Sequence, residues 1–106
     1  MDFANARAEL GILLGAGILG LLSSADIDWC LDRARETDDY DPWTAAAEAA
    51  DMLGRRAKRG VVVEWDSDGQ RVKRGAADWE SMAADFRAAS PRNAGGQTPD
   101  FAFLIV

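Results

Sequence analysis

The sequence PWTAAAEAADMLGRRAKRG at residues 42–60 is followed by VVVEWDSDGQRVKR at 61–74 and GAADWESMAADFRAA at 75–89. The outer two pieces carry apolar residues at helical spacing, and the middle piece has the alternation and the Asp-Gly turn of a hairpin. No catalytic motif lies in this stretch. A helix, a small ribbon and a helix in so short a segment suit a subunit that associates sideways with copies of itself. We therefore expect an assembly protein rather than an enzyme.

The first of these helices is predicted to begin at Pro42 and to end near Lys58. Asp41 suits the cap position before it, proline suits its first position, and Gly60 suits its end. Its apolar face is nearly all alanine, which lets another helix approach closely: Trp43, Ala46, Ala47, Ala50 and Leu53. Its last turn carries cations that complement the carbonyl end of the helix: Arg55, Arg56, Lys58 and Arg59. We expect this basic cluster to contact a neighbouring subunit.

The middle piece predicts a two-residue turn at Asp68-Gly69. Such a turn pairs Glu64 with Lys73, Trp65 with Val72 and Asp66 with Arg71. One face then holds Val63, Trp65 and Val72, and the other holds two pairs of opposite charge. A shift of one residue would break both patterns, so the sequence specifies the register. An isolated ribbon is marginal in water, and we expect the apolar face to pack on a helix or on a neighbouring subunit.

Three further helices are predicted. Residues 3–14 form the first, and the capping-box spacing of Ser23 and Asp26 opens the second. Residues 76–89 form the last, which ends before Pro91. The large core side chains are predicted to be Ile27, Leu31, Trp43, Leu53, Trp79, Met82 and Phe86. Cys30 falls in the apolar stripe of the second helix, as a small core residue rather than a reactive thiol.

The predicted fold is mainly α: a small bundle of about four helices, with a short β-hairpin between the last two helices and an extended C-terminal tail. Residues 1–90 form the helical domain, and residues 91–106 form a flexible linker and an apolar tail. Residues 10–22 carry no charge, yet thirteen residues are too few to cross about 30 Å of hydrocarbon as a helix. We interpret residues 15–22 as an apolar loop that packs on the core or on a neighbour, and expect no contact with a membrane.

The tail ends in six consecutive apolar residues of high strand propensity: Phe101, Ala102, Phe103, Leu104, Ile105 and Val106. One hypothesis is that this segment docks as a strand on its own domain. The other is that it docks on another protein, by strand addition or in a groove. We favour the second, because a free apolar terminus is a liability in a monomer.

The composition of the chain argues against several kinds of binding and catalytic site. The net charge is −6, with 18 acidic and 12 basic residues, which does not favour nucleic-acid binding through phosphate neutralisation. The chain has no histidine and one cysteine, so it lacks the usual zinc ligands and the commonest general base. The glycines of GAGILG at residues 15–20 are not those of a P-loop, and no β-α-β unit surrounds them. We expect no cofactor and no metal.

Five sequence pieces follow one another in an order that matches a known family pattern. Ile12-Leu13-Leu14-Gly15 ends the first helix, and Ser24-Ala25-Asp26-Ile27 starts the second. The Ala-rich helix with its basic end follows, then the β segment, and then Trp79-Glu80-Ser81-Met82-Ala83-Ala84-Asp85-Phe86-Arg87. This order resembles that of the small head-to-tail connector proteins of long-tailed bacteriophages, over about residues 7–89. The first loop is more apolar here than is usual in that family, and the tail has no counterpart in the family pattern.

The resemblance implies a non-catalytic virion protein, made in the host cytoplasm and located in the neck. Such proteins form a ring, usually of twelve subunits in the virion, beneath the portal protein. The ring extends the DNA channel without specific binding and offers a platform to the next neck or tail protein. The apolar tail would hook onto the portal or an adjacent subunit. The acidic residues between Asp26 and Asp51 would face the lumen or a neighbour, where Arg55, Arg56, Lys58 and Arg59 would meet them.

Two other classes of function stay open. One is a small helical DNA-binding regulator, with the basic cluster on phosphates. The net charge of −6 and the lack of a clear helix-turn-helix pattern weigh against it. The other is a soluble partner-binding module, such as an inhibitor or an antitoxin. The mass of the protein in solution discriminates among the three.

Overall fold

The computed structural model describes residues 1–60, 64–67, 70–73 and 75–94. This part of the chain is mainly helical, with a short antiparallel hairpin between two of the helices, and the predicted fold class is confirmed. The helices are α1 (Phe3–Leu19), α2 (Ser24–Arg33), α3 (Pro42–Lys58), α4 (Ala76–Ala89) and α5 (Pro91–Ala94). The strands are β1 (Arg35–Glu36), β2 (Asp39–Tyr40), β3 (Glu64–Ser67) and β4 (Gln70–Lys73). The apolar segment at residues 101–106 lies outside the described residues.

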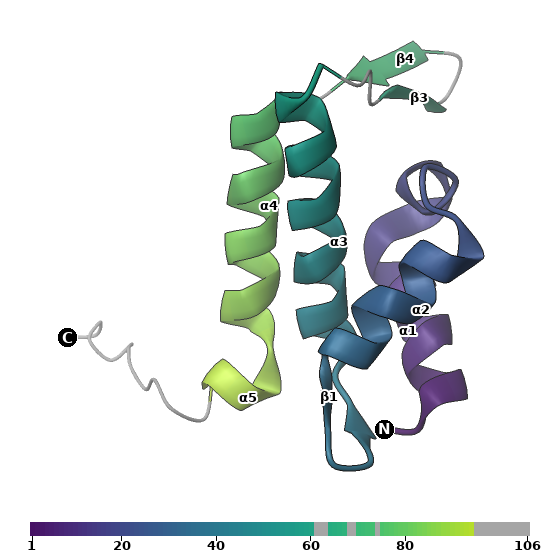
Figure 1. Cartoon of the computed structure of the whole chain (residues 1–106), viewed down its shortest axis with the longest axis vertical. Coiled ribbons are helices and arrows are strands. Elements are labelled where there is room, and N and C mark those ends of the chain that lie inside the picture. The colour runs from purple at the N-terminus through teal and green to yellow at the C-terminus, as the bar shows by residue number, and fades with distance from the viewer. Residues whose placement is uncertain (61–63, 68–69, 74, 95–106) are drawn as a thin grey trace, which may run out of the picture.

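Helix α3 stands at the centre of the bundle. Helix α4 runs antiparallel along one side of it, and α1 and α2 lie on the other side (Figure 1). Helix α3 is therefore buried on more than the one face that the sequence predicted. Its buried residues are almost all small: Pro42, Ala45, Ala46, Ala47, Ala49, Ala50, Leu53 and Gly54. Small side chains on both sides let helices pack against α3 from both directions.

The helix boundaries follow from caps that the sequence predicted. The carboxylate of Asp41 accepts hydrogen bonds from the backbone N–H groups of Trp43 (3.2 Å) and Thr44 (3.3 Å) at the start of α3. Gly60 follows the end of α3 with a φ of 84°, a conformation that favours glycine. Ser23 and Asp26 form a reciprocal capping box at the start of α2, with two hydrogen bonds of 3.0 Å.

Helix α1 is longer than predicted. Residues 16–19 are helical, where the sequence analysis placed an apolar loop. The two helical pieces meet at a kink at Gly15, whose φ of 81° and ψ of 158° are not helical. The stripe Ala6, Leu10, Leu14 and Ile18 is buried on both sides of this kink, so burial of Ile18 offsets the break that the glycine introduces.

The core contains most of the large side chains that were predicted for it. Ile27, Leu31, Leu53 and Trp79 are buried, and Met82 and Phe86 are half-buried against them. The prediction that Trp43 is a core residue is wrong, because its side chain is only half-buried and lies outside the buried core. It sits in the first turn of α3, at the end of the bundle, where its ring meets that of Phe86 at a centroid distance of 6.4 Å.

Cys30 is fully buried, as predicted for a core residue. Burial raises the pKa of its thiol to about 12, because the apolar surroundings disfavour the thiolate. The neutral thiol is a poor nucleophile at physiological pH.

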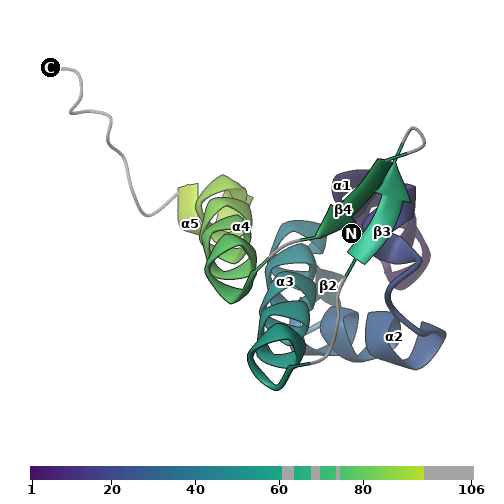
Figure 2. The ribbon, with the colours of Figure 1, turned by 90° about the horizontal axis from the view of Figure 1, so that it is seen from above.

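The hairpin has the predicted register. Glu64 pairs with Lys73, Trp65 with Val72 and Asp66 with Arg71 in an antiparallel ladder. Strand β3 also contacts α1, and Figure 2 shows the hairpin lying over that helix. The predicted turn at Asp68-Gly69 and the interface residue Val63 lie outside the described residues. A second ribbon, β1–β2, forms where the sequence analysis expected only a polar break, and it pairs Arg35 with Tyr40.

The helical domain extends beyond the predicted boundary at residue 90. Helix α4 ends at Ala89 as expected, but Pro91–Ala94 form the short helix α5. Within this helix, the Arg92 guanidinium donates hydrogen bonds to the backbone oxygens of Ala34 (2.6 Å) and Asp39 (2.9 Å). The first residues of the predicted linker, Pro91–Ala94, are therefore helical and held to the rest of the described chain.

The small-residue packing of α3 predicts opposite effects for two glycine-to-alanine substitutions. A Cβ at Gly54 would lie 3.1 Å from the Cβ of Trp79, which is fixed to the α4 backbone. The expected overpacking loss of about 1–3 kcal/mol exceeds the gain in helix propensity of about 1 kcal/mol, so Gly54→Ala should lower the free energy of unfolding.

Gly11→Ala is the matched control in α1. Its Cβ would meet only the flexible end of Leu19, at 3.4 Å, so it should raise the free energy of unfolding by about 0.5–1 kcal/mol. Urea denaturation followed by circular dichroism measures both changes. Equal stabilisation by the two substitutions would show that α3 and α4 are not packed this closely.

Candidate assembly surfaces

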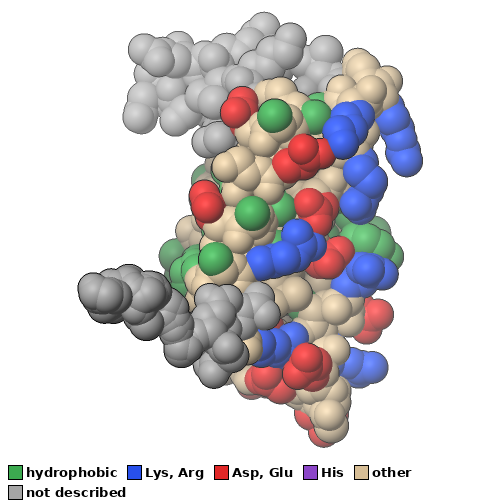
Figure 3. All heavy atoms as spheres, turned by 90° about the vertical axis from the view of Figure 1, so that its left-hand side faces the viewer, with side chains coloured by type: hydrophobic (Ala, Val, Ile, Leu, Met, Phe, Trp, Pro, Cys, Tyr) green, Lys and Arg blue, Asp and Glu red, His purple; other side chains and the backbone are tan. Residues whose placement is uncertain are grey.

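The acidic side chains of α3 are largely neutralised within the chain. Arg87 of α4 bonds to Asp51 at 2.6 Å and to Glu48 at 3.4 Å, and Arg33 of α2 bonds to the same Glu48 at 3.1 Å. Glu48 thus joins three helices. The hydrogen bond to Asp51 is the main reason that the pKa of Arg87 is raised above its usual value. Figure 3 shows such side chains as a band of alternating acidic and basic groups along one edge of the α4 face.

The basic cluster at the end of α3 divides into two pairs. Arg56 bonds to Asp26 at 3.1 Å and Lys58 bonds to Glu80 at 2.6 Å, both within the chain. Arg55 and Arg59 are exposed, and neither forms an ion pair with any of the described residues. Of the four cations predicted to meet a neighbour, these two are the ones that no described acidic group engages.

Asp26 links α2 to the end of α3. Its carboxylate accepts the backbone N–H of Ser23 in the capping box and also the guanidinium of Arg56. The backbone hydrogen bond is the largest reason that the pKa of Asp26 lies below its usual value of 3.8, and Arg56 adds to it. The carboxylate that the sequence analysis assigned to a cap therefore also anchors the basic cluster.

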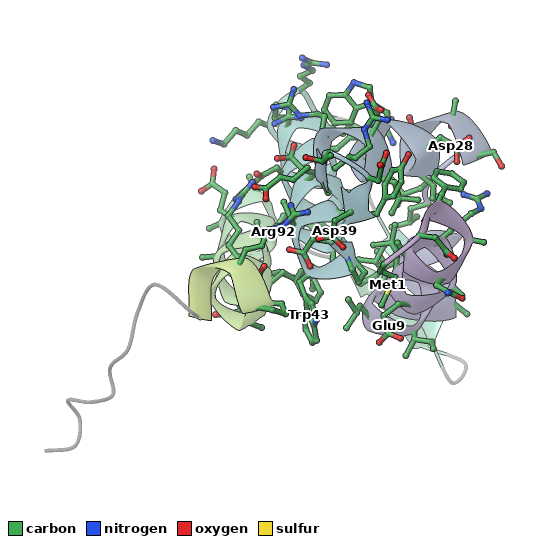
Figure 4. The ribbon with its side chains drawn as sticks, turned by 90° about the horizontal axis from the view of Figure 1, so that it is seen from below. Met1, Glu9, Asp28, Asp39, Trp43 and Arg92 are labelled. Carbon is green, nitrogen blue, oxygen red and sulfur yellow. The ribbon has the colours of Figure 1, made fainter. Side chains whose placement is uncertain are left out.

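Arg92 fixes the opposite end of the bundle. Besides its two backbone bonds, it reaches the carboxylate of Asp39 at 3.2 Å and that of Glu36 at 3.6 Å. The Met1 ammonium also bonds to Asp39, and this contact followed by that of Arg92 lowers the pKa of the carboxyl. Figure 4 shows Arg92 and Asp39 side by side, near Met1. These contacts of Arg92 are not visible in the sequence, because nothing local marks an arginine that reaches a hairpin so far away along the chain.

A buried polar contact lies beside this clamp. The Ser90 hydroxyl is fully buried and donates to the carboxylate of Asp41 at 2.5 Å. The Thr44 hydroxyl donates to the same oxygen at 2.5 Å. The cap of α3 is thus also the contact that joins the start of α3 to the end of α4. Ser90 before a proline gave the end of α4 in the sequence, but not this second role.

An apolar groove of about 530 Å³ opens between α1 and α2. It is lined by Phe3, Ala4, Ala8, Gly11, Leu19 and Ile27, with Arg7 as the charged residue at its rim. Phe3 is itself partly exposed, and its ring packs edge-on against Tyr40 at a centroid distance of 5.4 Å. This groove was not predicted from the sequence, because it depends on the kink in α1.

No group of three or more metal-ligating side chains comes together within the described ranges. A cavity of about 340 Å³ lies at the end of the bundle near Met1 and is lined by Asp39, Asp41 and Arg92, among others. The polar groups of these side chains already form hydrogen bonds: Arg92 donates to Asp39, and Ser90 donates to Asp41. Among the described helices, none is long and apolar enough to cross a membrane.

The remaining predicted interface residues are only partly placed. Trp65 and Val72 pair in the hairpin ladder, while Val63 falls outside the described residues. The docking-tail residues Phe101, Phe103, Leu104, Ile105 and Val106 are outside them as well.

No protein-family model matches this chain, and no curated protein or solved structure is significantly similar to it.

The double role of Asp26 predicts a pH-dependent loss of stability in Asp26→Asn. The substitution removes the charge that faces Arg56 and the N-terminus of α2, so the free energy of unfolding at pH 7 should fall by about 1 kcal/mol. The pKa of Asp26 is lower in the folded chain than in the unfolded chain. The stabilisation is therefore complete above about pH 5 and is lost as the pH falls through the folded pKa.

Urea denaturation at pH 7 and near pH 3 measures the difference between wild type and variant, which should shrink at the lower pH. Asp85→Asn, on the exposed face of α4, serves as the control and should change stability little at either pH. A loss that is equal at both pH values would mean that the charge of Asp26 is not its source.

Proposed function

We propose that this chain is the subunit of a ring that joins the head of a long-tailed bacteriophage to its tail. The ring, of twelve subunits in the virion, would sit in the neck beneath the portal protein. It would extend the DNA channel and present a platform to the next neck or tail protein. The chain would have no catalytic role.

The observation that carries this proposal is the order of the elements. The helices α1 and α2, the Ala-rich helix α3, the β3–β4 hairpin and the helix α4 follow one another in the order of the resemblance, and the short β1–β2 ribbon and α5 are additions to it. The hairpin stands beyond one end of the α3–α4 pair and lies over α1 (Figure 2). The end of α3 that carries Arg55 and Arg59 lies at the same end of the bundle as the hairpin (Figure 1). These are the features that a neighbouring subunit would cover.

The internal ion pairs weigh against the DNA-binding alternative. Two of the four cations at the end of α3 are held by Asp26 and Glu80. The neutralisation of several phosphates needs several available cations, and the described chain offers only Arg55 and Arg59 in this cluster. A ring around passing DNA has the opposite requirement, because a lumen that grips phosphate would slow the DNA.

The proposal predicts assembly in solution. The purified chain, alone or mixed with portal particles, should give ring-shaped particles in negative-stain microscopy and a multiple of the subunit mass of 11.4 kDa in light scattering. A chain that stays monomeric under both conditions, and that shifts duplex DNA at about 150 mM salt, would contradict the proposal and favour the regulator.

The charge at the end of α3 gives a second prediction. Reversal of Arg55 and Arg59 together to glutamate should reduce the assembled fraction at least about tenfold, if these two cations meet acidic groups of a neighbour. The intrachain pairs of Arg56 and Lys58 remain intact in this variant, so its fold should be unchanged by circular dichroism.

Arg35→Glu is the matched control for this variant. Arg35 is also exposed and forms no ion pair with the described residues, but it lies in β1 at the other end of the bundle. Assembly that is insensitive to the double reversal, or equally sensitive to Arg35→Glu, would exclude a specific role for the basic end of α3.

A further inference from the structure

We infer that the groove between α1 and α2 receives the apolar segment Phe101–Val106 of a second copy of this chain. This inference rests on the proposed function in one respect: it requires that copies of the chain associate. It names the surface and the segment through which they would do so.

The groove is a product of two glycines. In a straight helix Gly11 and Leu19 would be about 12 Å apart along the axis. Here a Cβ at Gly11 would lie 3.4 Å from the end of Leu19, because the chain turns back after Gly15. The absent side chain of Gly11 leaves the floor open, and the returning Leu19 forms a wall opposite Phe3. Ala4 and Ala8 are exposed and have small side chains, so they leave the groove open to solvent.

The chemistry of the groove matches that of the segment. The groove has a volume of about 530 Å³, within the range of about 300–1,000 Å³ that bound ligands occupy. Residues 101–106 carry no polar side chain, and Asp100 directly precedes them. Arg7 at the rim bonds to Asp28 at 3.1 Å, but its side chain is 37% exposed and a guanidinium has five donors. Arg7 also donates to the Ser24 hydroxyl at 3.2 Å, and its remaining N–H groups can donate to a second carboxylate, such as that of Asp100.

The fold favours a second copy as the source of the segment. The described chain ends at α5, which packs on α4, whereas the groove lies between α1 and α2 across α3 (Figures 1 and 2). Residues 95–100 reach at most about 20 Å when fully extended. The axes of packed helices are about 8–10 Å apart. Residues 95–100 of the same chain would have to pass around both α3 and α4 to reach the groove, because they cannot pass between packed helices. A contact between two unlike surfaces associates copies head to tail, and such contacts close into a ring where the rotation between subunits closes.

A cysteine pair tests the contact directly. A chain with Ala8→Cys and Phe103→Cys, treated with a mild copper-phenanthroline oxidant, should give disulfide-linked dimers and higher species on a non-reducing gel. Cys30 can remain, because it is fully buried. Disulfide formed only within one chain would place the tail on its own groove and overturn the inference. The absence of any 8–103 disulfide in full-length chain at high concentration would also overturn it.

A complementation experiment separates this inference from the proposed ring. Ala8→Glu places a charge in the groove at an exposed helix position, and Phe101→Asp with Phe103→Asp removes the apolar segment. Neither variant alone should associate in sedimentation velocity, but an equimolar mixture should give a one-to-one dimer, since each partner keeps one intact half. Ala84→Glu, an equally exposed substitution on α4, is the control and should associate like wild type.

The outcomes distinguish the two proposals. Rings formed by Ala8→Glu as readily as by wild type would overturn the groove assignment and leave the proposed function standing. Disulfide-linked dimers from a chain that forms no ring, alone or with portal particles, would support the groove and count against the ring. Circular dichroism confirms that each variant keeps its helices.

Discussion

The close approach of helices to α3 is the constraint on which the rest of the structure depends. Five alanines and Gly54 are buried along this helix, on more than one of its sides. With larger residues there, α4 could not lie against one side while α1 and α2 lie against the other. Small side chains bury little apolar area each, so the bundle relies on the large residues that reach α3 from its neighbours: Leu10, Leu31 and Trp79. Helix α3 therefore sets the distance between its neighbouring helices, and the large side chains of those helices supply most of the apolar contact.

Polar contacts fix how these helices are placed relative to one another. Glu48 joins α2 and α4 to α3, and Asp26 of α2 bonds to Arg56 near the C-terminal end of α3. Asp41, Ser90 and Arg92 do the same at the base. An alanine surface is smooth and would tolerate sliding of one helix along another. The partly buried ion pairs and the buried Asp41–Ser90 bond add direction to a packing that apolar contact alone leaves loosely specified.

The predictable part of this fold is the part that is encoded locally. Asp41-Pro42, Ser23 with Asp26, and Gly60 set helix ends through contacts within a few residues, and the structure has those ends. The hairpin register followed from alternation and charge within ten residues. The kink at Gly15 was not predictable in this way, because glycines at residues 11, 15, 17 and 20 look alike until the core selects one to break. The partners of Arg87 and Arg92 depend on which helices meet, and so could not be found from spacing.

The same distinction governs the surfaces. A basic cluster is visible in the sequence, but only the fold shows that Arg56 and Lys58 form ion pairs within the chain, whereas Arg55 and Arg59 form none with the residues that the structure describes. A groove cannot be seen in the sequence at all, since it needs Leu19 to return over Gly11. The described chain therefore presents unlike features on different sides: two cations at one end of α3 and an apolar groove beside α1. Unlike features on different sides suit head-to-tail contacts, in which each copy presents one surface to a different surface of the next copy.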